Sequence, residues 1–557
     1  MLTTHRYTTA FALFEALWEA RITACFVNVG SDHPSIIEAI LKGKRERPDK
    51  WPRFITCPAE ITALSMADGY ARISGKPQAV VVHVDVGTQA LGQAVHNASI
   101  ARVPVFIFAG LCPCTESGEL TGSRTEYMHW LQQAPDQAAI VRQYCRFTGE
   151  VRTGLNVKQS VGRALQFANS APRGPVYLAS AREVLAQEIQ PYSLQQDQWV
   201  PIGPSALPLD AVQEMCIALV QAERPLVITG YSGRDRRTPD LLVALADAIP
   251  GIRVHDTGGS DTTVIYHVDS DPLNQQIPVS FFPAHGRWKV DSFTALNQLL
   301  GHIKSSASLR KALEDPKFAA RGKARAKAHQ LRLANINAQR NLDDAAALDA
   351  DNIGHLLKTA LPESTTFVIE AVTAAQTLHD QIQPRRPESW INCGGTGIGW
   401  SNGAALGIKM ALEDLEKAGI EEPRLVCQVV GDGSFMCASP SSALWVARKC
   451  EIPILTMVLN NGGWKAPRNS TELVYPEGLN ISASDDEINI SFRPTPNYAA
   501  LAEAAAGCAI GSPSSEQNDW MQGVRVSNVG QLYAALNTAK EKVGGKKKGM
   551  LIEVIMY

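Results

Sequence analysis

The chain has 557 residues, too many for a single hydrophobic core, so roughly two to four domains are expected. Hydrophobic residues make up 45% and charged residues 19% of the chain, as in ordinary globular proteins, and the net charge of −2 gives no reason to expect nucleic acid or a membrane as a partner. The 11 cysteines lack the spacing of a zinc site, and no apolar run reaches the roughly 18 residues of a membrane span, so the composition indicates a cytoplasmic protein with reduced thiols.

The first third of the chain alternates short apolar runs with helical patterns. A turn of glycine or polar residues follows most of the runs, and a helical pattern follows the turn. This alternation predicts a doubly wound parallel sheet, because parallel strands need crossover connections, which are usually helices. The predicted strands are residues 24–29, 53–57, 78–84, 103–109 and 175–179.

Polar side chains stand where two of these strands end. Ser31, Asp32 and His33 follow the first strand, and Glu60 stands where the second strand passes into a helix. Ligands of open α/β sheets bind at the carboxyl ends of the strands, so polar residues placed there could contact a ligand, although most polar groups at strand ends serve as caps or core hydrogen bonds. A carboxylate in the first turn of a helix is also favoured by the helix dipole, which would explain Glu60 without a catalytic role.

The middle of the chain follows a polar, proline-containing linker at 187–204. A further α/β unit begins with the apolar run 225–229. Residues 310–350 then carry many lysines and arginines, a pattern more typical of a solvated helix face than of a nucleic-acid site.

The last third carries the stretch around which the chain is organised. Residues 425–430 and 453–459 are short apolar runs, typical of buried parallel strands, and a helical pattern over 434–449 joins them. Asp432 follows the first run inside a Gly-Asp-Gly turn, and Asn461 follows the second inside an Asn-Asn-Gly-Gly turn. Both side chains therefore stand at carboxyl ends of parallel strands.

These two turns have the chemistry of a metal–phosphate site. Mg²⁺ takes oxygen ligands and is usually shared with substrate phosphates. Asp432 offers a carboxylate oxygen, Asn461 an amide oxygen and a glycine turn a bare carbonyl. Gly433 and Ser434 open the predicted helix, whose N-terminus favours a phosphate. Two ordinary turns are the simpler interpretation, since Asp-Gly and Asn-Gly are common turn dipeptides.

The motifs GDGS at 431–434 and NNGG at 460–463 together resemble the diphosphate and metal motif of thiamine-diphosphate-dependent enzymes. Glu60 followed by ADGYAR at 67–72 resembles a second element of that family, and the glycine-rich run at 394–400 resembles a third. The resemblance spans nearly the whole chain and implies three doubly wound parallel-sheet domains of the α/β class. They are a pyrimidine-binding domain at 1–186, a central domain at 200–340 and a diphosphate-binding domain at 345–557.

The resemblance implies two cofactors, thiamine diphosphate and Mg²⁺. By the motif match, Asp432, Asn461 and the backbone carbonyl of Gly463 hold the metal, and Gly433 and Ser434 lie at the diphosphate.

The ring-side residues follow from the same resemblance. Glu60 would hydrogen-bond N1′ of the aminopyrimidine ring, which promotes removal of the thiazolium C2 proton. Ile398 would be the wedge that bends the cofactor, and the Thr396 carbonyl would accept from the 4′-amino group.

The substrate side is less specific. Ser31, Asp32 and His33 match the family loop that faces the substrate, and the pair Gly30-Ser31 is like that of the benzoylformate decarboxylase type. The paired histidines of the pyruvate decarboxylase type are absent from 111–133.

The central domain of the family is normally a six-stranded sheet, but residues 256–263 leave too little chain for that number. Either this domain is short or an interior segment is missing, and we favour the second because removing an interior strand leaves backbone groups unpaired. No fingerprint for FAD or ADP is present in this region.

Three functions remain open. The first is decarboxylation of a 2-oxo acid, releasing an aldehyde or transferring the acyl unit to a second carbonyl as acetolactate synthases do. The alternative is an acyl-CoA lyase such as oxalyl-CoA decarboxylase or 2-hydroxyacyl-CoA lyase. A cofactor-free regulatory homologue is the third, but the intact Glu60, Asp432 and Asn461 speak against it. The resemblance also implies a homodimer or homotetramer, because the two cofactor-binding domains of the family meet across a subunit interface.

Overall fold

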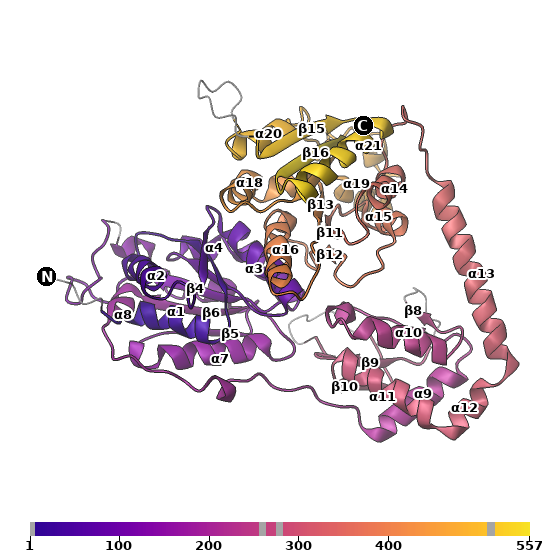
Figure 1. Ribbon diagram of the computed structural model, residues 1–557, viewed down its shortest axis with the longest axis horizontal. Helices are drawn as coiled ribbons and strands as arrows, with labels where there is room; N and C mark the ends of the chain where they lie inside the picture. The colour runs from indigo at the N-terminus through magenta and orange to yellow at the C-terminus, as the bar shows by residue number, and fades with distance from the viewer. Residues whose placement is uncertain (1–5, 128, 255–262, 275–281, 509–518, 557) are drawn as a thin grey trace. The chain divides into compact units, whose positions relative to one another are not determined.

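The computed structural model describes residues 6–127, 129–254, 263–274, 282–508 and 519–556. The chain divides into two compact units, one formed by Met1–Pro201, Asn341–Pro384 and Ser389–Tyr557 and the other by Ile202–Arg340 and Arg385–Glu388. The larger unit holds two six-stranded sheets (Figure 1). In the described ranges no helix combines the length and the apolar character needed to cross a membrane. All eleven cysteines lie in these ranges, and each is a free thiol.

The N-terminal sheet consists of parallel strands in the order β2-β1-β3-β4-β6-β5. The chain passes from β1 to β2 on one side and then places β3 on the other side of β1, so the strand order reverses between β1 and β3. All five predicted strands are present, and the half-polar β5 adds a sixth. The strands are β1 (Ala24–Asn28), β2 (Arg53–Thr56), β3 (Ala79–Val82), β4 (Phe106–Leu111), β5 (Phe147–Glu150) and β6 (Val176–Ala181).

The C-terminal sheet repeats this topology. Its parallel strands follow the order β12-β11-β13-β14-β16-β15, and the order reverses between β11 and β13. In open α/β sheets the point of reversal is where ligands bind, so each sheet indicates one binding edge. The strands are β11 (Thr366–Glu370), β12 (Trp390–Asn392), β13 (Val426–Gly431), β14 (Leu455–Asn460), β15 (Met521–Val526) and β16 (Gly549–Ile555).

Helices cover both faces of each sheet, because strands buried on both sides need apolar partners on both sides. One face of the N-terminal sheet packs on α1 (Thr9–Glu19), α2 (Pro34–Glu46) and α7 (Val157–Asn169). One face of the C-terminal sheet packs on α14 (Ala350–Ala360), α15 (Ala375–Ile382) and α21 (Val529–Ala539). The other two faces share a single continuous core that includes α3 (Glu60–Ser74), α5 (Gly92–Ile100), α16 (Trp400–Lys417), α18 (Pro440–Lys449) and α20 (Tyr498–Ala505).

The shared core is closed by a tight crossing of α3 and α16, which lie side by side (Figure 1). Glycines allow the two backbones to touch. A Cβ on Gly407 would lie 1.9 Å from the Met66 carbonyl oxygen, and a Cβ on Gly69 would lie 2.2 Å from the Ala404 carbonyl oxygen. The ADGYAR motif therefore has a packing role in addition to any chemistry, because Gly69 belongs to it.

Replacing Gly407 with alanine is expected to destabilise the protein by about 1–3 kcal/mol, because the new methyl group meets backbone that cannot move aside. The matched control is Gly301→Ala in α11 (Ser292–Ser305), where a Cβ meets no atom within 4 Å. That change is expected to stabilise by roughly 0.5–1 kcal/mol. Denaturant-induced unfolding measures both changes, and equal midpoints for Gly407→Ala and the wild type would contradict the tight crossing.

In its described residues the smaller unit contains two short two-stranded parallel sheets, β7 with β8 and β9 with β10. Residues 256–262, from the stretch that predicts a short or interrupted central domain, lie outside the described residues. The cationic helix α13 is exposed along most of its length, as predicted for a solvated face, and Phe318 is its buried residue. The bounds are α9 (Leu209–Gln221), β7 (Leu226–Val227), α10 (Thr238–Ala248), β8 (Arg253–Val254), β9 (Tyr266–Asp269), β10 (Gly286–Lys289), α12 (Ala307–Leu313) and α13 (Pro316–Ala338).

Two predicted elements of the last third are wrong in detail. The helix predicted over 434–449 is two helices, α17 (Asp432–Cys437) and α18, because Ser439 adopts a left-handed conformation and Pro440 restricts the residue before it. The stretch 461–491 is rich in Pro, Gly and Ser, a composition that predicts a long loop, but it contains the helix α19 (Lys465–Val474). Pro467 lies in its first turn, where no intrahelical N–H is needed, so this proline does not break the helix.

Candidate functional site

Asp432 organises the carboxyl edge of the C-terminal sheet. It follows β13, and only 2% of the residue is exposed. Its carboxylate accepts hydrogen bonds from the backbone N–H groups of Gly433 at 2.8 Å, Gly462 at 2.9 Å and Gly463 at 3.1 Å. The turn after β14 is therefore fastened to the turn after β13, and the two predicted metal-binding motifs lie together in space.

The Asp432 carboxylate suits a cation. Among the described residues it has no positively charged partner, and burial raises its pKa above the usual value against the opposing effect of the three N–H donors. The nearby Asn461 side-chain oxygen accepts from the Gly463 N–H at 3.2 Å. Carboxylate, amide and carbonyl oxygens are the ligands Mg²⁺ takes, so this donor set fits that metal.

The described residues hold no group of three or more His, Cys, Asp or Glu side chains arranged to bind a metal. A cation at Asp432 would thus need further ligands from a phosphate or from water, which is usual for Mg²⁺.

The glycine-rich loop before α16 lies against the N-terminal domain. The Asn97 side chain of α5 donates to the Gly397 carbonyl at 2.7 Å and accepts from the Gly397 N–H at 3.0 Å. Gln93 donates to the Ile398 carbonyl, and Ile398 is partly buried while Thr396 is exposed. Helix α5 thereby fixes the loop that carries the two predicted ring-side residues.

The loop is fixed a second time by Arg72, the last residue of the ADGYAR motif. Its guanidinium donates to the carbonyls of Asn392 at 2.7 Å and Cys393 at 2.8 Å, and it pairs with Asp68 one turn back on α3. The same guanidinium stacks on the ring of Trp400, 4.5 Å from its centroid. The motif therefore couples α3 to the start of the glycine loop, and its charged residues act in this chain as structural anchors.

Glu60 is the first residue of α3 and stands at the carboxyl end of β2, as predicted. Its side chain is 12% exposed, and its Oε1 lies 3.7 Å from Nε2 of His83. His83 follows β3, at the point where the strand order reverses. His83 falls inside the strand predicted over 78–84 and was given no individual role, whereas β3 ends at Val82 and leaves His83 at the strand end.

Within the described part of the chain, no hydrogen bond or ion pair joins Glu60 to the glycine loop or to Asp432. The carboxylates of Glu60 and Asp432 in one chain are therefore not linked by a direct hydrogen bond or ion pair.

The three loop residues after β1 lie in different environments. Ser31 is exposed, whereas Asp32 and His33 are buried. Asp32 accepts from the Val84 N–H at 2.9 Å and lies 3.3 Å from the His33 ring, and burial lowers the pKa of His33. Asp32 and His33 thus brace the turns after β1 and β3, and Ser31 is the one whose side chain reaches the surface.

Ser31 is tied to a charged pair that the sequence analysis missed. Its hydroxyl donates to the Glu126 carboxylate, which also accepts from the buried Arg182 at 3.0 Å. Burial opposes ionisation of Glu126, but the bonds from Ser31 and Arg182 outweigh it, and the pKa of Glu126 lies below its usual value. No local pattern links residues 56 positions apart, so this pair could not be predicted.

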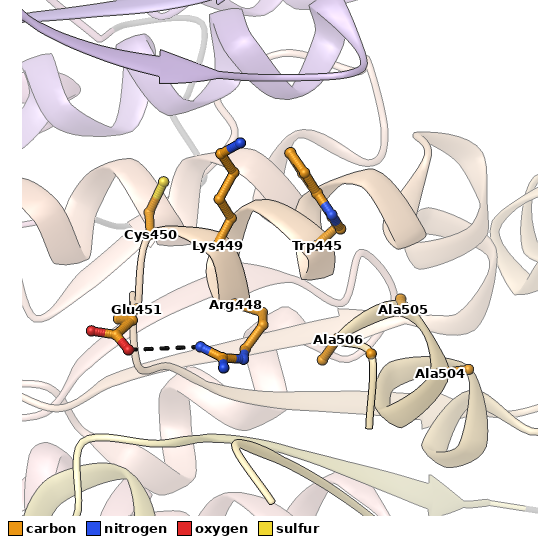
Figure 2. A pocket seen from close by; sticks show the side chains of 9 residues that line it. Trp445, Arg448, Lys449, Cys450, Glu451, Ala504, Ala505 and Ala506 are labelled. Atoms are coloured by element: carbon orange, nitrogen blue, oxygen red, sulfur yellow. Dashed lines mark ion pairs between the residues drawn. The ribbon is translucent and has the colours of Figure 1, made fainter. Parts of the chain in front are cut away.

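A cavity of about 710 Å³ lies elsewhere, at the C-terminal ends of α18 and α20 (Figure 2). Trp445, Lys449 and the ion pair of Arg448 with Glu451, 3.7 Å apart, line it. Helix α18 ends where the chain turns into the start of β14, so this cavity lies at the amino edge of the sheet. Asp432 and Asn461 stand at the carboxyl edge, and the cavity is not part of the candidate site.

Family comparison agrees with this geometry. A model described as the N-terminal TPP binding domain of thiamine pyrophosphate enzymes matches residues 7–140, and one described as the C-terminal TPP binding domain matches residues 371–554. The two together cover more than half of the chain. This chain belongs to the thiamine pyrophosphate enzyme family. It is accordingly an enzyme that uses thiamine diphosphate, the same compound under its other name.

Individual relatives of this thiamine pyrophosphate enzyme are distant. It is 23% identical over 517 residues to benzoylformate decarboxylase of Pseudomonas aeruginosa, covering 85% of this chain and 90% of that protein. It is 23% identical over 507 residues to human 2-hydroxyacyl-CoA lyase 2, covering 77% and 76%. The solved thiamine diphosphate-dependent 4-hydroxybenzoylformate decarboxylase of Rhodococcus jostii RHA1 shares its fold, with a TM-score of 0.73 and 19% identity over 99% of both chains.

Proposed function

We propose that the protein decarboxylates a 2-oxo acid with thiamine diphosphate and Mg²⁺, and either releases an aldehyde or transfers the acyl unit to a second carbonyl. The observation that carries the proposal is the buried Asp432 carboxylate, which has no cationic partner among the described residues and is fastened to the glycine turn after β14. A buried carboxylate without a countercharge is energetically costly, and a divalent cation bound there would offset that cost.

In this proposal the metal side of the site consists of the two strand-end turns. Asp432, the Asn461 side chain and the Gly463 carbonyl would hold Mg²⁺, and Gly433 and Ser434 would lie against the diphosphate. A Cβ on Gly433 would lie 2.4 Å from Nε1 of Trp464, so only glycine leaves the backbone free at this turn.

The ring side is provided by Glu60, Thr396 and Ile398. Glu60 would hydrogen-bond the aminopyrimidine ring and hold a proton there, for which a side chain largely removed from water is suited. The Thr396 carbonyl would accept a hydrogen bond from the ring's amino group, and Ile398 would pack against the cofactor. When bound, thiamine diphosphate supplies the electron sink for breaking the bond beside the substrate carbonyl.

On the substrate side we propose that Ser31 contacts the 2-oxo acid, with Asp32 and His33 holding its loop in place. The Ser31 hydroxyl proton is engaged by Glu126, so Ser31 presents lone pairs to its surroundings. His83 lies beside Glu60 at the same strand edge and is placed to exchange a proton there.

We further propose that two copies of the chain form the working enzyme, as a homodimer or homotetramer, in which Glu60 of one copy serves the metal site of the other. The lack of a direct contact between these two sites within one described chain supports this arrangement. The boundaries 1–186, 200–340 and 345–557 are retained as proposed domains, and the free state of all eleven cysteines supports a cytoplasmic location.

The second candidate is cleavage of an acyl-CoA, which the similarity to human 2-hydroxyacyl-CoA lyase 2 supports. Lys546, Lys547 and Lys548 near the C-terminus could bind a CoA phosphate. Of these three, Lys548 forms an ion pair with Asp519 in this structure.

A substrate screen separates the two candidates. The enzyme is incubated with thiamine diphosphate and Mg²⁺ and either pyruvate, 2-oxobutyrate or benzoylformate, or a 2-hydroxyacyl-CoA thioester. Release of carbon dioxide from a 2-oxo acid, absent in Glu60→Gln, is the expected result. Cleavage of the 2-hydroxyacyl-CoA, with no carbon dioxide released from any of the 2-oxo acids, would overturn the first proposal in favour of the second.

A further inference from the structure

Glu370 is a buried carboxylate to which the sequence analysis gave no role. It ends β11, on the strand that borders the reversal point of the C-terminal sheet, and only 5% of the residue is exposed. Its Oε1 accepts from the Gly399 N–H at 3.0 Å, and its Oε2 accepts from the Ser401 N–H at 3.0 Å and from the Ser401 hydroxyl at 2.7 Å. Three donors thus converge on one carboxylate at the start of α16.

These bonds fix the backbone directly after the glycine loop. Ile398 immediately precedes Gly399, so the carboxylate lies one residue from the proposed wedge of the cofactor. A Cβ on Gly399 would lie 2.2 Å from the Cβ of Ala438, so this turn also packs closely on the segment after α17.

A chain of buried amides and hydroxyls continues from Glu370 to the metal side. The Gln428 side chain of β13 donates to the Ser401 hydroxyl and to the Asn402 side-chain oxygen, both at 2.9 Å. The Asn402 amide donates to the Phe435 carbonyl at 2.9 Å and the Ala438 carbonyl at 3.3 Å. Phe435 belongs to α17, the short helix that begins with Asp432.

The side-chain oxygen of Gln428 is also hydrogen-bonded, because the Thr456 hydroxyl of β14 donates to it at 3.0 Å. All five side chains are buried, and every atom named above has its partner. Fully satisfied buried networks of this kind fix one arrangement of the elements they join. The members are Glu370, Ser401, Asn402, Gln428 and Thr456.

We propose that Glu370 is a positioning residue of the cofactor site, whose carboxylate holds the Ile398 loop and, through Ser401, Gln428 and Asn402, sets its spacing from the Asp432 turn. The inference rests on the proposed function for the roles of Ile398 and Asp432. It adds a residue that contacts neither cofactor nor metal and acts through backbone that does.

The burial and charge of the Glu370 carboxylate favour a positioning role for this residue over that of a simple helix cap. Among the described residues Glu370 has no cationic partner, and burial raises its pKa to about 7 against the bonds from Ser401 and Gly399. Directly after β12, the ionisable group that faces Glu370 is the Cys393 thiol, whose pKa burial raises to about 12 and which stays neutral. Asp68 and Arg72 of α3 face that thiol as an ion pair, and the neighbours from β13 and α16 are neutral.

Protonation would turn one of the two acceptor oxygens of Glu370 into a donor. Its O–H would then face an N–H or O–H group that donates to the carboxylate in the ionised state, and that hydrogen bond would be lost. The cofactor site is thus expected to be held best above pH 7, where Glu370 is ionised, and to loosen as the pH falls through that value.

The test is calorimetric titration of the apo-protein with thiamine diphosphate and Mg²⁺ at pH 8 and pH 6. Glu370→Gln puts an amide donor where the structure needs an acceptor, and the Kd for thiamine diphosphate is expected to rise about 10- to 100-fold at pH 8, as for outer-shell partners of metal sites. The difference from the wild type should shrink at pH 6, where the wild-type carboxyl is itself protonated.

Two further variants keep the result interpretable. Ser401→Ala breaks the link to Gln428 in a helix that tolerates alanine, and it should weaken binding even if Glu370→Gln does not fold. Asp349→Ala is the matched control, because it removes the N-terminal cap of α14, which packs on the opposite face of the same sheet from α16. It should lower the unfolding midpoint and leave the Kd unchanged.

The outcomes separate this inference from the proposed function. If Asp432→Asn abolishes binding but Glu370→Gln and Ser401→Ala bind as the wild type does at both pH values, Glu370 is only a helix cap and the inference is overturned. If Asp432→Asn also binds normally, the proposed cofactor site itself is wrong.

Discussion

Replacing Asp432 with asparagine is expected to weaken Mg²⁺-dependent binding of thiamine diphosphate by at least about 100-fold, because even outer-shell partners of metal sites cost about 10- to 100-fold when changed. Asparagine keeps the size of the side chain but removes the charge that a hard cation needs. One of its two polar atoms also becomes a donor facing the N–H groups of Gly433, Gly462 or Gly463, which the carboxylate accepts in the wild type. Calorimetric titration with and without Mg²⁺ measures the loss.

The matched control for this variant is Asp349→Asn. Asp349 also accepts a backbone N–H, from Asn352 at the start of α14, but asparagine caps a helix about as well as aspartate does. This control should bind thiamine diphosphate like the wild type. Normal Mg²⁺-dependent binding by Asp432→Asn would mean that the metal lies elsewhere, and equal loss in both variants would point to misfolding.

The parts of this site that could be predicted are those carried by short, continuous patterns. Asp432 and Asn461 follow apolar runs directly, so the ends of β13 and β14 and their edge of the sheet follow from local chain order. Glu60 was found in the same way at the end of β2. Such residues can be predicted from the sequence, because ligands of open α/β sheets bind at the carboxyl ends of the parallel strands.

The parts that could not be predicted depend on contacts between distant segments. Nothing near Asp32 in the sequence shows that its carboxylate turns inward to the Val84 N–H rather than outward to a substrate. Glu370 directly follows the apolar run 366–369, which indicates a strand end, but its three donors come from the start of a helix 29 to 31 residues later. The Ser31 and Glu126 contact likewise spans 95 residues. Burial and pairing of this kind are properties of the folded chain.

Replacing Glu60 with glutamine is expected to leave thiamine diphosphate binding nearly intact but to slow proton exchange at C2 of the bound cofactor by about 10²- to 10⁴-fold, the usual contribution of a positioned acid or base. Glutamine preserves the shape of a side chain that is 12% exposed and lies 3.7 Å from His83, but it cannot share a proton with the aminopyrimidine ring. Acid-quenched hydrogen–deuterium exchange followed by NMR measures the rate.

The control is Asp210→Asn, which removes a first-turn carboxylate from α9 in the smaller unit. If Glu60 served only to complement the dipole of α3, both substitutions would lower stability slightly and neither would change exchange at C2. Slow exchange in Glu60→Gln together with normal exchange in Asp210→Asn would assign the effect to the ring. Equal exchange in all three proteins would remove Glu60 from the site.

The same variant tests whether the site is shared between two copies of the chain. Glu60→Gln and Asp432→Asn are each expected to be inactive, yet a mixture that exchanges subunits should recover about a quarter of the wild-type rate. In a two-fold symmetric dimer, half of the randomly formed pairs are mixed, and each mixed pair has one site with both residues intact. This recovery requires that Glu60 and Asp432 of one site come from different chains. If both residues came from the same chain, every site would carry one of the substitutions and no activity would return after mixing.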